Sequence, residues 1–150
     1  MTSFSDEIAR WEERGPDVVP IYYPVVDADI EALVKIASVH QDLIDFWKDK
    51  GCANFNTDSY GRSVSTWITN RLLEPSEIIF LIQETCGIVE DLLPHGLPFF
   101  NMFDLEHLVI NDKGQIISPN PDGSEQLVAE NLQEFLDKLM LWPTCYEPDS

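Results

Sequence analysis

Apolar residues in the first third of the chain recur three or four positions apart, which is the spacing of one helical face. This pattern predicts a helix over residues 27–39 capped by Asp27, and a second helix that starts at a capping box of Ser38 and Gln41 and stops at Gly51. Ahead of them, residues 5–15 predict a short helix, and the prolines between residues 16 and 24 predict extended chain. The apolar positions expected to be buried in the two main helices are Ile30, Leu33, Val34, Ala37, Leu43, Phe46 and Trp47.

The middle of the chain changes from helical spacing to alternation. Asn, Asp, Ser and Gly over residues 52–62 predict a loop, and residues 64–73 then alternate in the manner of a strand, with Trp67 and Arg71 on one face. A helix is predicted to follow, because Pro75 suits a first helical turn. Its expected buried stripe is Ile78, Leu81 and Ile82, and its expected end is Cys86-Gly87.

Short apolar runs separated by turn residues fill the last third. Residues 97–102 and 105–110 predict two strands, and the turn Asn111-Asp112-Lys113-Gly114 predicts a hairpin into residues 115–117. Asn131 and Glu134 predict the capped start of a closing helix. The other expected features are a turn over 119–124, a strand over 127–129, a buried helical stripe of Leu132, Phe135, Leu136 and Leu139, and a helix end at Pro143.

This order of elements predicts an α+β fold with a central, mostly antiparallel sheet flanked by helices. The length of 150 residues is that of one domain, so residues 1–150 are expected to form a single unit. Residues 1–26 are expected to supply an N-terminal helix and an extended lead-in, and residues 143–150 a loose tail.

The net charge of the chain limits the kinds of molecule that it is expected to bind. It carries 27 acidic and 9 basic side chains, for a net charge of -18. Direct binding to nucleic acid or to an anionic membrane is therefore excluded, since both depend on Lys and Arg, whereas a basic protein partner is favoured. Residues 1–71 hold 7 basic and 12 acidic residues, a net of -5, and residues 72–150 hold 2 basic and 15 acidic residues, a net of -13. Residues 72–150 are thus the expected source of the negative electrostatic field that would attract a basic partner.

Several features indicate a cytoplasmic protein without a metal or cofactor. Asp6 and Glu7 lie where a secretory signal would carry positive charge, and no apolar run reaches the roughly 18 residues that a membrane span needs. Cys52, Cys86 and Cys145 lack the CxxC spacing of zinc sites, and their odd number disfavours a disulfide framework. They are expected to be reduced thiols.

Candidate chemistry is sparse. Asp104, Glu106 and His107 form the nearest approach to an acid/base cluster, but neighbouring residues of a strand point to opposite faces, and no nucleophile or phosphate-loop motif accompanies them. A carboxylate/His hydrolase is therefore the least favoured function. His40 and His95 are interpreted as a helix-start residue and a turn residue.

The four tryptophans differ in their expected roles. Trp11 and Trp47 lie on apolar helix faces and are expected in the core, while Trp142 either closes over the core or projects from it. Trp67 shares a strand face with Arg71, which is a composition typical of an interface anchor.

Four segments in order resemble the SUKH superfamily, which contains bacterial immunity proteins and fungal regulators of cell-wall glucan synthesis. They are HQDLIDFWKDKGC, NRLLEPSEI, LEHLVINDKGQIIS and LVAENLQEFLDKL, and together they occupy the chain from residue 38 to residue 139. The chain departs from the family pattern at Lys50-Gly51-Cys52, where an Asn-Gly pair is usual, and at residues 99–102, where a glycine is usual. The resemblance implies a sheet wrapped by helices and, in bacteria, stoichiometric neutralisation of a cognate toxin, often a basic nuclease or deaminase.

We therefore expect a non-enzymatic immunity protein that occludes its toxin with an acidic surface, without a cofactor, and that is a monomer or small homo-oligomer when free. The alternative is a regulatory scaffold of the same fold. The carboxylates at helix ends and turns of the acidic half are the expected contacts, with one aromatic anchor. These candidate partner-binding residues are Trp67, Glu84, Glu90, Asp91, Asp104, Glu106, Asp122 and Glu125.

Overall fold

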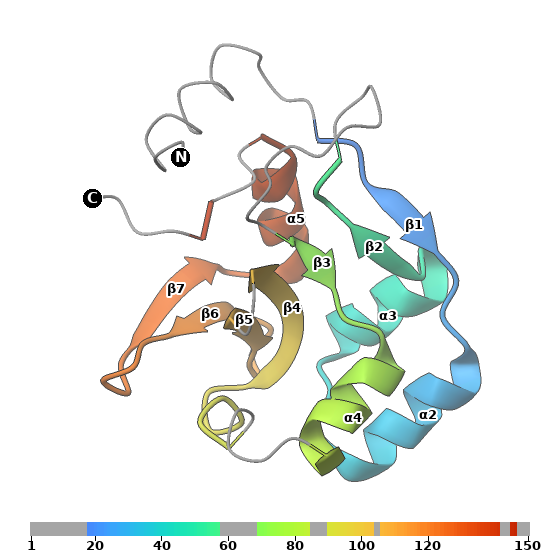
Figure 1. The fold of residues 1–150 in the computed structure, drawn as a ribbon, viewed down its shortest axis with the longest axis horizontal. Helices are drawn as coiled ribbons and strands as arrows, with labels where there is room; N and C mark the ends of the chain where they lie inside the picture. Colours follow the sequence, from blue (N-terminus) through green and yellow to red (C-terminus); the bar gives the residue numbers. More distant parts are fainter. Residues whose placement is uncertain (1–17, 58–68, 85–89, 104–105, 142–144, 147–150) are drawn as a thin grey trace.

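The computed structural model describes residues 18–57, 69–84, 90–103, 106–141 and 145–146. Within these residues the fold is α+β, with a seven-stranded sheet whose neighbouring strands are all antiparallel (Figure 1). Each strand pairs with the next strand in the sequence, so the sheet is a meander. The strands are β1 (Ile21–Tyr23), β2 (Cys52–Asn54), β3 (Arg71–Leu72), β4 (Leu97–Phe103), β5 (Glu106–Ile110), β6 (Ile116–Pro119) and β7 (Glu125–Ala129), and the helices are α2 (Asp27–Ile36), α3 (Gln41–Asp49), α4 (Pro75–Glu84) and α5 (Leu132–Leu141).

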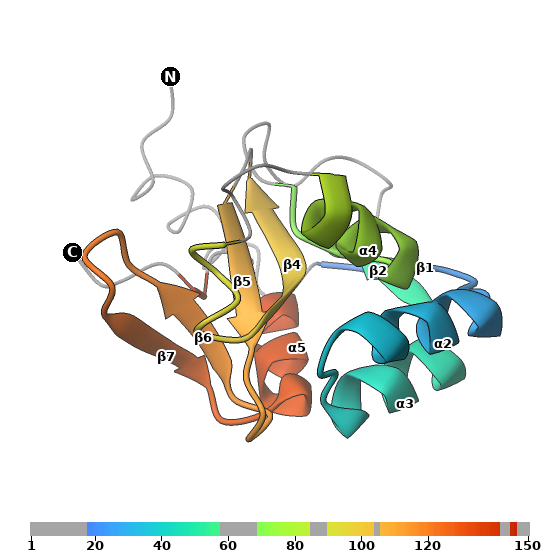
Figure 2. The same cartoon turned by 90° about the horizontal axis from the view of Figure 1, so that it is seen from below.

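The helices lie in two groups relative to the sheet. Figure 2 shows α2, α3 and α4 grouped on one side, away from the β6–β7 hairpin, while α5 lies closer to the sheet. None of the helices in the described ranges is long and apolar enough to cross a membrane.

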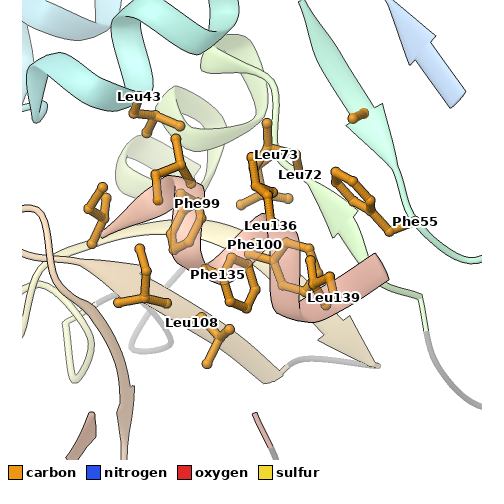
Figure 3. Close-up of a cluster of buried hydrophobic side chains, with 14 of the residues drawn as sticks. Leu43, Phe55, Leu72, Leu73, Phe99, Phe100, Leu108, Phe135, Leu136 and Leu139 are labelled. Atoms are coloured by element: carbon orange, nitrogen blue, oxygen red, sulfur yellow. The ribbon is translucent and has the colours of Figure 1, made fainter. Parts of the chain in front are cut away.

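Aromatic rings from β4 and α5 form the centre of the core (Figure 3). The rings of Phe100 and Phe135 meet edge to face with centroids 5.0 Å apart, and Phe99 lies 5.9 Å from Phe135. All three are fully buried. Leu97 through Met102 are buried without interruption, which is typical of a strand covered on both faces. The core therefore fixes β4, and β4 in turn positions β5.

Several predicted turns and caps are confirmed. Gly114 closes the β5–β6 hairpin at φ +83°, a left-handed conformation that glycine adopts at little cost. Helix α4 begins at Pro75 as the sequence predicts. At the start of α5, Asn131 Oδ1 accepts the Glu134 N–H at 2.8 Å, and the Glu134 carboxylate accepts the Glu130 N–H at 2.7 Å. The predicted stripe of α5 is buried at all four positions.

The first two helices depart from prediction at their ends. The capping box of Ser38 and Gln41 is wrong, because His40 is the N-cap of α3 and its Nδ1 accepts the Asp42 N–H at 3.0 Å. Helix α2 ends at Ile36 rather than at residue 39, and Asp27 is its first residue instead of its cap. Val34 is 47% exposed, because it lies at the edge of the stripe that buries Ile30 and Leu33.

The sheet also contains strands that the sequence did not predict. The supposed loop after Gly51 begins with β2, and the proline-rich lead-in contains β1, because the two segments pair with each other. Of residues 69–73, only Arg71 and Leu72 form strand, since Asn70 adopts φ +41° and interrupts the extended chain. Several predicted features lie outside the described residues. They are the helix over 5–15 with Trp11, residues 64–68 of the predicted strand, the helix ends at 86–87 and 143, Trp142 and residues 147–150.

Candidate partner-binding surface

A hollow of about 550 Å³ lies between the turn that precedes β4, the β4–β5 pair and the β6–β7 hairpin. We call it the acidic hollow. Figure 1 places the turn, in yellow, below these strands and the orange hairpin beside them. The acidic hollow is lined by residues 90–92, Pro94, His95, Met102, Glu106, His107, residues 118–121 and Gly123.

Glu106 reaches the acidic hollow because it opens β5. Its side chain is exposed, while the next residue, His107, is 8% exposed. Asn101 of β4 pairs with His107, and its Nδ2 donates to the Glu106 carbonyl at 3.2 Å. The buried Asn101 amide therefore fixes the backbone from which the Glu106 carboxylate projects.

The β6–β7 turn holds Asp122 in an ordered geometry. Its Oδ1 accepts the backbone N–H of Ser124 at 2.9 Å and the Ser124 hydroxyl at 2.6 Å. These hydrogen bonds hold the pKa of Asp122 below its usual value. Gly123 takes φ +91° to close the turn. Asp122 thus stays ionised beside Pro121 and Gly123, both of which line the acidic hollow.

His95 connects the turn before β4 to the start of β7 beside the acidic hollow. Its Nδ1 lies 2.7 Å from Glu125 Oε2, on the first residue of β7. Its backbone N–H donates to the Leu92 carbonyl at 2.9 Å, so His95 is the turn residue that the sequence predicts. The pairing with Glu125 has no counterpart in the sequence pattern, because thirty residues separate the two side chains.

The structure brings most of the predicted site residues together. Glu90, Asp91 and Glu106 line the acidic hollow, Glu125 contacts it through His95, and Asp122 lies between two of its lining residues. Glu84 is the last residue of α4, at a position where its side chain is not described. Trp67 and Asp104 lie outside the described residues.

No Lys or Arg occurs among the described residues that line the acidic hollow. One of the two lysines of the acidic half is engaged elsewhere. Lys138 lies 3.3 Å from Glu134 and donates to the Val128 carbonyl at 3.1 Å. Carboxylates that gather without Lys or Arg focus a negative potential, which favours a positively charged partner.

A second hollow, of about 400 Å³, adjoins the first. We call it the Phe80 hollow. His107 lines both hollows. The Phe80 hollow is lined by Arg71, Leu73, Ser76, Glu77, Phe80, Leu81, Asn101 and His107.

Arg71 and Glu77 form a two-pronged ion pair at the Phe80 hollow. Arg71 Nη2 donates to Glu77 Oε2 at 2.6 Å, and Nη1 donates to the other oxygen. Partial burial opposes ionisation of Glu77, but the hydrogen bonds from Arg71 and from the Glu74 N–H outweigh it and hold the pKa of Glu77 below its usual value. Arg71 and Glu77 therefore neutralise each other's charge within the Phe80 hollow.

Two thiols lie in apolar surroundings. Cys52 is buried and its Sγ donates to the Leu72 carbonyl at 2.8 Å. Burial raises the pKa of Cys52 to about 12, and burial also raises that of Cys145 to about 12. Among the described residues, no three His, Cys, Asp or Glu side chains are arranged to hold a metal ion.

Comparisons with protein-family models, with curated proteins and with solved structures find no match to this chain. The resemblance to the SUKH superfamily therefore stays a prediction from the sequence.

Proposed function

We propose that this protein binds a basic protein partner through the acidic hollow and neutralises it, as an immunity protein neutralises a cognate toxin. The observation that carries the proposal is the gathering of carboxylates in and beside one hollow. Glu90 and Asp91, from the turn before β4, and Glu106, from β5, line it, and Asp122 and Glu125 come from the β6–β7 hairpin that borders it.

The charge of such a surface suits a partner that itself binds nucleic acid. A nuclease cleft carries Lys and Arg to contact phosphates. Carboxylates held at fixed positions take the places of those phosphates and block the cleft. They also raise the association rate, because complementary fields steer the encounter, with gains of roughly 10- to 1000-fold. Inhibition of this kind is stoichiometric and requires neither turnover nor a cofactor.

The direct experiment uses the protein encoded by the neighbouring upstream reading frame as the probe. It is expressed in bacteria with and without this chain, and growth is recorded. The two purified proteins are then mixed, and their association rate is measured from about 20 mM to about 500 mM salt. We expect growth to be restored and the association rate to fall steeply as salt increases, because salt screens exposed charges.

A matched pair of double variants locates the surface. Asp91→Asn with Glu106→Gln removes two charges at the acidic hollow, and Glu31→Gln with Asp49→Asn removes two exposed charges on α2 and α3. The first variant should slow association several-fold more than the second. Binding without growth protection would favour the regulatory scaffold. Equal slowing by both variants, or a rate independent of salt, would overturn the acidic hollow as the binding surface.

A further inference from the structure

Phe80 is exposed on α4, whose other apolar residues are buried or partly buried. Ile78 of α4 is fully buried, and Phe80, two positions later, is 62% exposed. Two residues correspond to about 200° around a helix, so Phe80 faces away from the stripe that anchors α4. An isolated exposed apolar side chain is common in proteins. Phe80 differs because it forms a wall of the Phe80 hollow.

The rest of the Phe80 hollow has the composition of a binding pocket for an apolar side chain. Leu73 and Leu81 supply apolar lining, and the Arg71–Glu77 ion pair supplies a polar border. Because this pair is already matched, an incoming apolar group would leave neither charge without its partner. An aromatic wall with an arginine beside it is the composition enriched at the energetic centres of protein interfaces.

The Phe80 hollow shares one wall, His107, with the acidic hollow. His107 lines both, and Asn101, which lines the Phe80 hollow, donates to the backbone of Glu106 in the acidic hollow. A partner that covers the acidic hollow and extends past His107 therefore reaches the Phe80 hollow. The charge of the acidic hollow selects a partner whose contacting surface is basic.

We propose that the Phe80 hollow receives an apolar side chain, flanked by Lys or Arg, from the same basic protein that the acidic hollow attracts. The acidic hollow steers the encounter, and the Phe80 hollow holds the complex once it has formed. This inference rests on the proposed function, and it assigns the two hollows to different kinetic steps.

The test measures association and dissociation rates with the neighbouring-frame protein as the probe. Phe80→Ala should raise the dissociation rate about 30-fold, as expected for the loss of an interface anchor, and leave the association rate and its salt dependence nearly unchanged. Leu141→Ala is the matched control, because Leu141 is 64% exposed on α5 and lines neither hollow. Ser76→Tyr, at the edge of the Phe80 hollow, should give a similar rise by obstructing entry. Unfolding midpoints are measured for all three variants.

The outcomes separate the two proposals. If the probe does not bind the unmodified protein, both the proposed function and this inference fail. If the probe binds and responds to Asp91→Asn with Glu106→Gln, but Phe80→Ala and Ser76→Tyr dissociate at the original rate, the function stands and this inference is overturned. An equal effect of Leu141→Ala would also overturn it.

Discussion

His95 and Glu125 connect the turn before β4 to the start of β7, with Nδ1 and Oε2 2.7 Å apart. The imidazole is 17% exposed on its side chain and the carboxylate 45%. The pair therefore lies at the rim of the acidic hollow, where it links two of the three segments that supply carboxylates. Glu125 is both a support for the surface and a part of its charge.

This double role separates Glu125 from Glu90. Glu125→Gln should lower the free energy of unfolding by about 0.2–1 kcal/mol, the range for exposed pairs, because it removes the charged partner of His95. Glu90→Gln, at an exposed turn position, should leave stability nearly unchanged. Urea denaturation measures both. Each variant loses one charge from the same surface, so both should slow association with the partner to a similar extent. A stability loss for Glu90→Gln as large as that for Glu125→Gln would contradict this assignment.

Gly51 and Gly123 allow the loss of stability on adding a side chain to be compared at two positions of similar backbone conformation. Both have positive φ, +87° and +91°. A Cβ at Gly51 would collide with the Tyr23 carbonyl oxygen and lie 3.2 Å from the Pro24 Cα, whereas one at Gly123 would meet nothing within 4 Å. Gly123→Ala should therefore cost only the left-handed strain of about 1–2 kcal/mol. Gly51→Ala should cost about 2–5 kcal/mol, because a backbone collision is added to that strain. Equal costs in urea denaturation would show that the chain beside Gly51 can move.

The fold was predictable where local chemistry and tertiary structure agree. The turn at Gly114, the start of α4 at Pro75 and the buried stripe of α5 each follow from residues close together in the sequence. Strands β1 and β2 were not predictable in this way. Each has three residues, and they are extended because Tyr22 pairs with Ala53, 31 positions later in the chain. Their local composition favours a lead-in and a loop, and the pairing overrides it.

The candidate surface was predictable in its charge and not in its shape. The clustering of carboxylates in the second half selected Glu90, Asp91 and Glu106, but their convergence depends on the order of strands in the sheet. Phe80 was missed, although its position off the Ile78 stripe is a signal that helical periodicity contains. His95 was interpreted only as a turn residue, because nothing local indicates its distant partner.

Cys52 should be almost inert in the native protein. Its thiol is fully buried and its pKa is raised to about 12 by burial, so the reactive thiolate is scarce at pH 8. Alkylation by iodoacetamide, followed residue by residue with mass spectrometry, should be at least about 100-fold slower in buffer than in concentrated urea. Cys145 should behave similarly, since its pKa is also about 12. Labelling of Cys52 in buffer at the rate of the unfolded chain would contradict the buried placement of β2.

The Arg71–Glu77 pair should contribute to acid sensitivity. The pKa of Glu77 is lower in the folded protein than in the unfolded chain, so folding favours its ionised form. The resulting stabilisation is complete above the ordinary glutamate pKa of about 4.3, and it disappears as the pH falls through the lower folded value. Glu77→Gln should lower stability at pH 7 by about 1–2 kcal/mol, because it removes a charge-assisted pair that is only partly exposed.

The loss of stability caused by Glu77→Gln should become smaller in acid. Below the ordinary glutamate pKa of about 4.3 the unfolded chain takes up a proton on Glu77 more readily than the folded protein does, so the difference in unfolding free energy between the two proteins should shrink as the pH falls. Glu31→Gln, an exposed α2 residue, is the control and should differ little from the unmodified protein at either pH. Urea denaturation at pH 7, 5, 4 and 3 measures the trend. A difference for Glu77→Gln that stays constant from pH 7 to pH 3 would show that the side chain acts through shape and packing, with no contribution from its charge.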